Sequence, residues 1–383
     1  MKKVILGLLI CGTLFCNHSF AQYLNYSDIR ISLLTAAPGQ PLYAVFGHNG
    51  IRVKVDTLNY DVVYNYGTFN FNQPYFYLNF ARGWMNYYLS VSTYDRFMAE
   101  YMYENRKIRE QVFELDSIQT MFMLNFLENN ARPENRYYWY NFFLDNCATR
   151  IRDLVEETFP GLPIPETLET PTYRELINCY LGEHPWGRFW IDIALGLPTD
   201  QKTNLYEQMF LPDYLFETYS RLLYNGRPII KETTDIFIPT SPAIKPAGTI
   251  TPAIVCFMIL ALAFLFVYVK KGSRIFDFLL FFVVGITGLL IIYLWFFSIH
   301  IFTGTNLNII WALPTHLVMA FFLLRRERNN YIRKYFLITA IIAMLLVVFW
   351  VFLPQRLNPA LIPFVLAIAL RAFRIFRFER QQV

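Results

Sequence analysis

The chain has 383 residues, 55% of them hydrophobic and 16% charged, and its formal net charge is +5. This composition is too apolar for an ordinary soluble protein and is typical of a membrane protein with a substantial water-facing part. The positive charge gives no support to nucleic-acid binding, because residues 22–250 hold 19 Lys and Arg against 26 Asp and Glu, a net of −7.

The N-terminus predicts a removable signal peptide over residues 1–21. Two lysines precede an apolar run over residues 5–15 that is too short to span a bilayer, and the small-x-small tripeptide SFA ends at Ala21. A lipoprotein cleavage box at Cys16 is disfavoured, because bulky Phe15 stands where a small residue is needed. The alternative is an uncleaved anchor. In both cases, we expect the following domain to be exported.

Residues 22–250 predict an α+β domain. Segment 41–71 alternates apolar and polar residues around a Gly-His-Asn-Gly interruption, and this pattern is typical of β-strands. From about Val91 the pattern becomes helical, and "DSIQTMFMLNFLENN" places apolar residues at helical spacing. Short helices and loops are expected from the Pro-rich connector "GLPIPETLETP" to about residue 240.

Residues 251–383 predict an all-α transmembrane bundle of five helices. The first four apolar stretches are near or above the length that crosses about 30 Å of hydrocarbon, whereas the fifth is shorter and carries Arg371 at its end. The expected spans cover about 252–269, 276–298, 307–324, 335–353 and 358–372.

Basic residues predict the orientation of this bundle. They concentrate after the first span, between the third and fourth spans, and in the C-terminal tail, whereas the loops at 299–306 and 354–357 hold only His300 and Arg356. By the positive-inside rule, the three basic segments face the cytoplasm. The sequence therefore predicts a multi-pass protein of a bacterial inner membrane, with its N-terminal domain in the periplasm and its C-terminus in the cytoplasm.

The cysteines of the exported domain allow a structural interpretation. Of five cysteines, two would leave with the signal peptide and Cys256 lies in the first span, so Cys147 and Cys179 remain. In an oxidising compartment, two cysteines are the smallest set that forms a disulfide. A Cys147–Cys179 bridge in a non-catalytic, membrane-anchored interaction protein is therefore one hypothesis.

The other interpretation makes Cys147 a nucleophile. "CATRIRDLVEETF" predicts a helix that begins at Cys147, with Asp145 or Asn146 as its N-cap. A thiol in the first turn faces unpaired N–H groups and the positive end of the helix dipole, and both favour the thiolate. The exported domain has two histidines, His48 and His184, and His48 lies beside two glycines at the start of a predicted strand. A cysteine at a helix start packed against a histidine on a strand is the arrangement of papain-like thiol enzymes.

The motifs around these two residues resemble one family. "FGHNGIRV", "YNYGTFNF", "RPENRYYWY" and "NFFLDNCATRIRD" are similar to the exported domain of the DUF4105 family, which includes the Lnb-type lipoprotein N-acyltransferases of Bacteroides-like bacteria. "TNLNIIWALPTH" resembles the transmembrane domain of the same family. The resemblance covers nearly all of the mature chain. It implies a permuted papain-like fold, similar to NlpC/P60 hydrolases and lecithin:retinol acyltransferase, in which the histidine precedes the cysteine.

The resemblance also implies a ping-pong acyl transfer. Cys147 would attack the ester carbonyl of a membrane phospholipid, with His48 as general base, and the thioester would pass its acyl chain to the α-amine of a diacylated lipoprotein's N-terminal cysteine. The implied partners are the phospholipid donor, the lipoprotein acceptor and the membrane, and no cofactor or metal is implied. The same residues also fit a periplasmic cysteine hydrolase of peptidoglycan or lipid esters, although a peptidoglycan amidase would need one anchor rather than five spans.

Other polar residues are candidates for supporting roles. Asp61 or Asn65, on the next strand, is expected to orient the imidazole. The Cys147 backbone N–H is expected to stabilise the oxyanion, with a second donor from the run 137–141. Asn146 and Tyr140 are candidates for contact with the oxyanion or the substrate.

Two arginines and one histidine of the exported domain have open roles. Arg150 and Arg52 are candidate phosphate contacts, and the alternative for each is a salt bridge with a carboxylate. We expect His184 to be structural, or to belong to a membrane-surface contact made through Trp186 and Trp190.

Polar residues also fall in or near the third span. His316 and Pro314 lie within it, with Asn306 and Asn308 at its outer edge. Such residues are functional candidates in a membrane, here for a lipid groove that faces the exported domain, and ordinary helix packing beside an interfacial Trp311 is the alternative.

Overall fold

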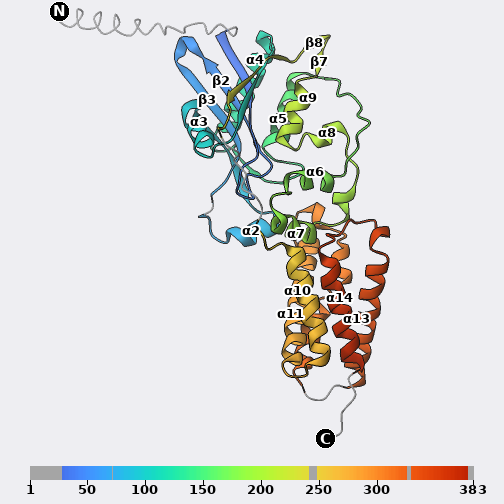
Figure 1. Cartoon of the computed structure of the whole chain (residues 1–383). Coiled ribbons are helices and arrows are strands. Elements are labelled where there is room, and N and C mark those ends of the chain that lie inside the picture. The colour runs from blue at the N-terminus through green and yellow to red at the C-terminus, as the bar shows by residue number, and fades with distance from the viewer. Residues whose placement is uncertain (1–27, 71, 241–247, 326–328, 378–383) are drawn as a thin grey trace, which may run out of the picture.

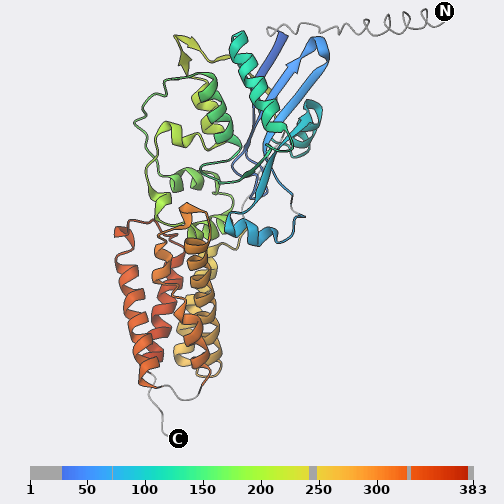
Figure 2. The same cartoon turned by 180° about the vertical axis from the view of Figure 1, so that it is seen from behind.

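The computed structural model describes residues 28–70, 72–240, 248–325 and 329–377. An N-terminal α+β part stands on one end of a bundle of long helices (Figure 1), and the view from behind shows the same stacking (Figure 2). The predicted signal peptide, residues 1–21, lies outside the described residues.

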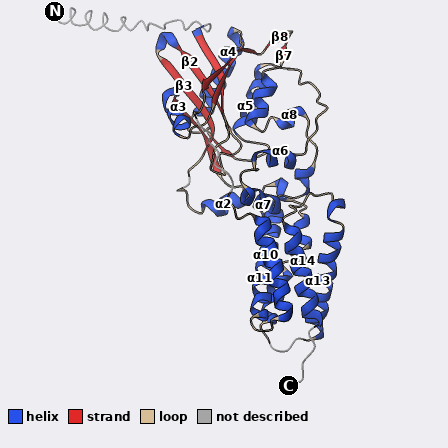
Figure 3. Cartoon of the chain, in the orientation of Figure 1, coloured by secondary structure: helices blue, strands red, loops and turns tan. Residues whose placement is uncertain are grey.

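The N-terminal part is built on a seven-stranded antiparallel sheet, and the strands are confined to this part of the described chain (Figure 3). The strand order is β6-β4-β3-β2-β1-β5-β9. The strands are β1 (Ile29–Ala36), β2 (His48–Val55), β3 (Tyr60–Thr68), β4 (Asn86–Thr93), β5 (Ile108–Phe113), β6 (Tyr137–Trp139) and β9 (Ile230–Phe237). A separate hairpin pairs β7 (Leu223–Tyr224) with β8 (Arg227–Pro228).

Side-chain alternation decides which helices cover each face of the sheet. Ile51 and Val53 of β2 join the main core beneath α4 (Ser117–Ala131) and α5 (Cys147–Thr158). Leu34 of β1 and Val63 of β3 point to the opposite face, where they pack with α3 (Tyr94–Tyr103). Both faces are therefore buried, and the two ends of the strands are left for a site.

Short helices connect the sheet to the bundle. The helix α2 (Phe76–Arg82) lies between β3 and β4 in sequence and at the junction of the two parts in space (Figures 1 and 2). The others that follow α5 are α6 (Tyr173–Tyr180), α7 (Pro185–Ala194), α8 (Leu205–Gln208) and α9 (Pro212–Tyr219).

The bundle contains α10 (Pro252–Tyr268), α11 (Ser273–Phe297), α12 (Thr315–Leu323), α13 (Asn330–Val348) and α14 (Leu361–Arg377). Within the described residues, three segments are long and apolar enough to cross a membrane, and α10 is a shorter apolar helix. These three segments are Ser273–Phe297, Ile301–Leu323 and Asn330–Val348. Inside the bundle, Arg371 of α14 forms a buried ion pair with Asp277 of α11, with a nitrogen–oxygen distance of 2.7 Å.

The third predicted span is a broken segment, not one helix. Two 3-10 turns, Ile301–Thr303 and Leu307–Ile310, precede α12. This segment packs against two glycines of α11, because a Cβ on Gly288 would lie 1.9 Å from the Ala312 carbonyl oxygen. Such close backbone approach is how small residues hold helices together in membranes.

Polar side chains join α7 to the loops at the near end of the bundle. The Asn306 amide donates to the Ile193 carbonyl at 2.8 Å, and the Asn358 amide donates to the Asp192 carboxylate at 2.9 Å. Asp192 also pairs with the buried Arg174 of α6 at 3.0 Å. The loops predicted to face the periplasm therefore contact the N-terminal part directly.

Several predicted elements differ from the observed ones. Segment 41–71 contains β2 and β3, but residues 41–47 form turns. Sequence patterns missed β1, β4, α2 and β9, and also β5 and β6, which lie in the stretch after Val91 that was expected to be helical. Helices α4 and α5 lie where the helical spacing placed them.

Candidate active site

Cys147 is the first residue of α5, and Asn146 is the N-cap. The Asn146 side-chain oxygen accepts the N–H groups of Ala148 and Thr149 at 2.8 and 2.9 Å, and the Thr149 hydroxyl accepts the Asn146 N–H at 2.7 Å. This capping box fixes where the helix begins. The thiol is therefore held at the positive end of an amphipathic helix whose other face is buried in the core.

His48 begins β2 and lies beside this thiol. Its imidazole forms a hydrogen bond with the Cys147 side chain, and Nε2 forms a second one with the side-chain oxygen of Asn65 on β3. If Nε2–H donates to Asn65, then Nδ1 is left to accept the thiol proton. The structure thus brings together a thiol, an imidazole and a side chain that holds the imidazole, which is the arrangement that nucleophilic catalysis requires.

Gly67 marks the point where the site groups converge. A Cβ at this glycine would lie 3.7 Å from Cys147 Cβ, 3.8 Å from His48 Cε1 and 4.0 Å from the Tyr138 hydroxyl. Its φ is +88°, and the β3–β4 ladder shifts register between Asn65 and Thr68. The missing side chain therefore leaves a small space among the thiol, the imidazole and a phenol.

Charge and hydrogen bonding favour an ion pair between sulfur and imidazole. Burial by itself raises the pKa of the Cys147 thiol, but the charge and hydrogen bond of His48, with the N–H groups of Asn49 and Ala148, hold that pKa below its usual 9.0. Burial also opposes protonation of His48, yet the Cys147 thiolate and Asn65 raise the pKa of the imidazole above its usual 6.5. The pair is therefore poised to exist as thiolate and imidazolium.

Tyr138 of β6 supplies a hydroxyl to the same space. Burial, then the nearby Cys147 thiolate, raise the pKa of Tyr138 well above its usual 10.0, so the phenol keeps its proton. Among the described residues, its buried hydroxyl has no well-formed hydrogen bond, although it lies near the Gly67 backbone. Arg150 stacks over the Tyr138 ring, 3.9 Å from its centroid. Tyr138 is therefore a fixed, unused donor beside the sulfur.

Of the predicted supporting residues, Asn65 contacts His48, and Asp61 does not. Asp61 instead binds Arg52 through two hydrogen bonds of 2.6 and 2.8 Å. In the β2–β3 register Asp61 lies opposite Lys54, six residues from His48, which is about 20 Å along a strand. Asp61 is therefore too far along the sheet to orient the imidazole.

Both predicted arginine contacts are occupied by carboxylates. Arg52 is buried between Asp61 and Glu110 and lies under the Tyr94 ring, so it stabilises the sheet. Arg150 forms two hydrogen bonds with Asp145, at 2.5 and 2.7 Å. Of the two roles predicted for each arginine, the structure therefore shows the salt bridge with a carboxylate.

Asn146 and Tyr140 also differ from their predicted roles. The Asn146 amide donates to the Phe142 and Phe210 carbonyls, at 2.7 and 2.9 Å, while its oxygen caps α5, so the side chain has no atom left for substrate. Tyr140 stacks on Tyr87 with ring centroids 4.1 Å apart. Burial, then the charge of the Cys147 thiolate, raise the pKa of Tyr140 well above its usual 10.0, and both residues pack against the main core.

The three cysteines in the described part of the chain are not bridged. Cys147, Cys179 and Cys256 are all free, and the exposed Cys179 thiol donates to the Glu175 carbonyl at 3.3 Å. The predicted disulfide alternative is therefore wrong for this structure. In the parts of the chain that the structure describes, no cluster of three or more His, Cys, Asp or Glu side chains has the arrangement of a metal site.

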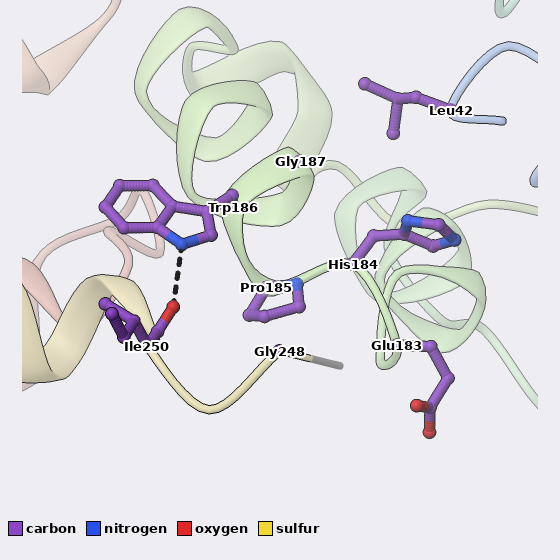
Figure 4. A pocket seen from close by; sticks show the side chains of 8 residues that line it. All are labelled: Leu42, Glu183, His184, Pro185, Trp186, Gly187, Gly248 and Ile250. Atoms are coloured by element: carbon purple, nitrogen blue, oxygen red, sulfur yellow. Dashed lines mark hydrogen bonds between the residues drawn. The ribbon is translucent and has the colours of Figure 1, made fainter. Parts of the chain in front are cut away.

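His184 caps α7 and lines a pocket of about 250 Å³ at the junction of the two parts (Figure 4). The Trp186 indole donates to the Ile250 carbonyl at 2.9 Å, whereas Trp190 is exposed. This pocket is separate from Cys147 and His48, which do not line it.

The polar residues of the third span have structural contacts. His316 is buried and accepts the Tyr335 hydroxyl at 2.6 Å, and Pro314 stands at the N-terminus of α12. Asn308 donates to the Asp192 carbonyl at 3.2 Å and accepts the indole N–H of a buried Trp311 at 2.9 Å. Helix packing therefore accounts for these residues.

Comparison with known proteins identifies both parts of the chain. Residues 17–178 match the family model described as the Lnb N-terminal periplasmic domain, and residues 243–382 match the one described as the Lnb transmembrane domain. The chain belongs to the Lnb family. It is thus a membrane protein with a periplasmic N-terminal domain. No curated protein and no solved structure is significantly similar to it.

Sequence reasoning missed several residues of this Lnb-family site. Gly67 lies in the motif "YNYGTFNF", where an isolated glycine inside a strand pattern is the signal of a bulge. Tyr101 of α3 stacks against His48 with ring centroids 6.3 Å apart, and Arg106 lies over Tyr101. No local pattern signals those two contacts, because they depend on how α3 packs on the sheet.

Proposed function

We propose that this Lnb-family protein is a phospholipid-dependent lipoprotein N-acyltransferase of the bacterial inner membrane. The observation that carries the proposal is the placement of Cys147 against His48, with Asn65 holding the far side of the imidazole. A thiolate at a helix start with a paired base is suited to acyl transfer through a thioester.

In the first half-reaction, the Cys147 thiolate attacks the ester carbonyl of a phospholipid. The tetrahedral oxyanion accepts hydrogen bonds from the Cys147 backbone N–H and from the Tyr138 hydroxyl, which borders the same space beside Gly67 as the thiol and has no well-formed partner among the described residues. The carbon–oxygen ester bond breaks, and His48 gives its proton to the departing lysophospholipid alkoxide. An acyl thioester remains on Cys147.

In the second half-reaction, the free α-amine of a diacylated lipoprotein's N-terminal cysteine attacks the thioester. Neutral His48 accepts the amine proton, the carbon–sulfur bond breaks, and the thiolate returns as an amide forms. The thioester keeps the acyl-transfer potential of the ester, so the transfer needs no ATP. Transfer to water in place of the amine would make the same site a lipid-ester hydrolase.

The arrangement of elements supports a permuted papain-like fold. The histidine is on a central strand of an antiparallel sheet, the cysteine begins a helix packed on that sheet, and the histidine comes first in the chain. A lipid substrate is supported by the bundle, whose near end contacts the catalytic part.

We further propose five membrane spans and a cytoplasmic C-terminus. Helix α14 begins near the N-terminal part and ends at the far end of the bundle (Figure 1). Lys270 and Lys271 follow the end of α10, and Arg325 follows the end of α12, as the positive-inside rule requires if these helix ends face the cytoplasm.

The decisive test uses the full-length protein with phospholipid vesicles and a diacylated lipopeptide. We expect an acyl mass increment on Cys147 before the acceptor is added, and loss of that increment with formation of an N-acyl lipopeptide afterwards. Cys147→Ser and His48→Ala should abolish the product. The proposal fails if Cys147→Ala forms product at the normal rate, if muropeptides alone are cleaved, or if water alone receives the acyl chain.

A further inference from the structure

The segment around α2 has the composition of a membrane interface. Between Asp61 and Asp95 the sequence contains one charged side chain, Arg82. Aromatic residues dominate this stretch, and several point to solvent: Tyr75 is 78% exposed, Phe80 53% and Trp84 49%. A group of large apolar side chains at a surface marks an interaction site.

Three contacts fix α2 at the outer end of span α11. The Arg82 guanidinium donates to the Tyr293 hydroxyl at 2.8 Å, the Ile299 N–H donates to the Arg82 carbonyl at 3.0 Å, and Nε2 of His300 bonds the Phe80 carbonyl at 2.8 Å. The 25 residues of α11 extend about 37 Å, which is more than the roughly 30 Å of hydrocarbon in a bilayer. The outer end of α11, and α2 with it, therefore lies at headgroup depth.

The backbone at the end of α2 is shaped for this contact. Gly83 ends the helix with a φ of +77°, and a Cβ there would lie 2.4 Å from Ile299 Cγ1. The exposed apolar side chains of Phe297 and Ile299 continue the surface of α2 onto the bundle. The apolar face of α2 is therefore continuous with the lipid-facing surface of the span.

A row of aromatic rings leads from α2 to the thiol. Ring centroids are 6.1 Å apart between Phe76 and Phe69, 5.1 Å between Phe69 and Tyr87, and 4.1 Å between Tyr87 and Tyr140. The phenol of Tyr140 interacts with Cys147, and both residues pack against the main core.

From this placement we infer that α2 is an interfacial helix that dips into the outer leaflet and presents a diacyl phospholipid to Cys147 along the aromatic row. A tryptophan and a tyrosine at headgroup depth, with one arginine and no carboxylate, match the amphipathic side chains and anionic phosphates of that zone. Delivery to the thiol rests on the proposed acyltransferase function, whereas contact between α2 and lipid does not.

The contact is tested by photo-crosslinking of the full-length protein in vesicles of diacyl phospholipid. Benzoylphenylalanine replaces Phe80, and the control replaces Ile118, a 74% exposed side chain of α4 on the sheet domain. We expect a phospholipid adduct, read by mass spectrometry, at position 80 and not at 118. Equal yields at both positions, no lipid adduct at 80, or a protein adduct in its place would overturn the inference.

Delivery is tested by comparing two donors. For Phe80→Glu, we expect the rate of Cys147 acylation from vesicle phospholipid to fall about tenfold or more, because a charge replaces an exposed apolar ring that inserts into the leaflet. The rate from a water-soluble short-chain phospholipid should stay unchanged. Ile118→Glu should change neither rate. Equal losses with both donors, or none, would refute delivery through α2. If the wild-type protein forms no acyl-Cys147 with either donor, the proposed function fails, and the crosslinking result still decides the lipid contact.

Discussion

Replacing Gly67 by alanine is expected to affect the rate of acylation and the free energy of unfolding by different amounts. The new methyl group would stand 3.7 Å from Cys147 Cβ and 3.8 Å from His48 Cε1, in ordinary van der Waals contact with both, so no clash prevents folding. However, it would occupy the space among the sulfur, the imidazole and the Tyr138 hydroxyl, which is where the proposed mechanism places the reacting carbonyl.

The two expected effects differ in size. Alanine at a φ of +88° is expected to cost about 1–2 kcal/mol of unfolding free energy. Displacing the reacting carbonyl by about 1 Å is expected to slow acylation of Cys147 about 100-fold. Gly226→Ala is the matched control, because Gly226 has a φ of +76° and no atom within 4 Å of its added Cβ.

The assay measures the rate of acyl-Cys147 formation by intact-protein mass spectrometry and stability by denaturant unfolding in detergent. Both variants should lose a similar free energy of unfolding, and Gly67→Ala alone should lose activity. If Gly67→Ala acylates at the wild-type rate, or if Gly226→Ala slows equally, then the space beside Gly67 does not hold the reacting group.

Four other changes test the site and the junction. Because His48 holds the pKa of Cys147 below 9.0, alkylation of the wild-type thiol by iodoacetamide should remain fast below that pH. His48→Ala should move the pH dependence of the alkylation rate to higher pH. An unchanged pH dependence would contradict the ion pair. Conversely, the pKa of His48 is raised in the folded protein, so protonated His48 contributes fully to the free energy of unfolding below pH 6.5. That contribution is lost as the pH rises through the folded pKa. Cys147→Ala should lower the pKa of His48, as measured by NMR. Tyr138→Phe should slow acylation about 100-fold, because it removes the proposed oxyanion donor. It should not reduce stability, because the Tyr138 hydroxyl has no well-formed hydrogen bond among the described residues. A large loss of stability would argue for a structural role. Asp192→Ala should cost about 3 kcal/mol of unfolding free energy, because it leaves the buried Arg174 with one carboxylate fewer, and a loss under 1 kcal/mol in denaturant unfolding would contradict that.

Local signals predicted the helix that carries the nucleophile. An Asx cap before an amphipathic run and a proline after it locate α5, and the structure has these features at Asn146 and Pro160. The pairing of Cys147 with His48 was also a prediction, made from residue type and a family resemblance. These features could be read from the sequence because each depends on a few neighbouring residues or a short motif.

The choice between Asp61 and Asn65 depended on strand register, which a sequence does not state. Both residues have the same parity on β3, so alternation could not separate them. The register is set by the turn at Asp56–Leu58 and the left-handed residue Asn59 that follows it. Only that turn places Asn65 near His48 and Asp61 near Arg52.

Strands β1 and β9 lacked a signal for another reason. β1 is buried on both faces, so its residues show little alternation, and β9 is a largely exposed edge strand with polar residues. α2 was missed because seven residues are too few for a helical period to stand out.

The hydrogen bonds and ion pairs that join α7 to the bundle loops determine how this molecule can be divided. Phe189 and Ile193 of α7 belong to the hydrophobic core of the bundle, and the Asn306 amide binds the Ile193 carbonyl. A soluble fragment that stops at residue 240 would carry α7 without its counterpart, exposing two core side chains and a severed hydrogen-bond network. Chimeras between relatives should therefore keep the sheet, α7 and the bundle together, because β9 pairs with β5 and a joint between α5 and β9 would divide the sheet. The position of the thiol relative to the bundle is then preserved, because the same hydrogen bonds between α7 and the bundle loops are kept.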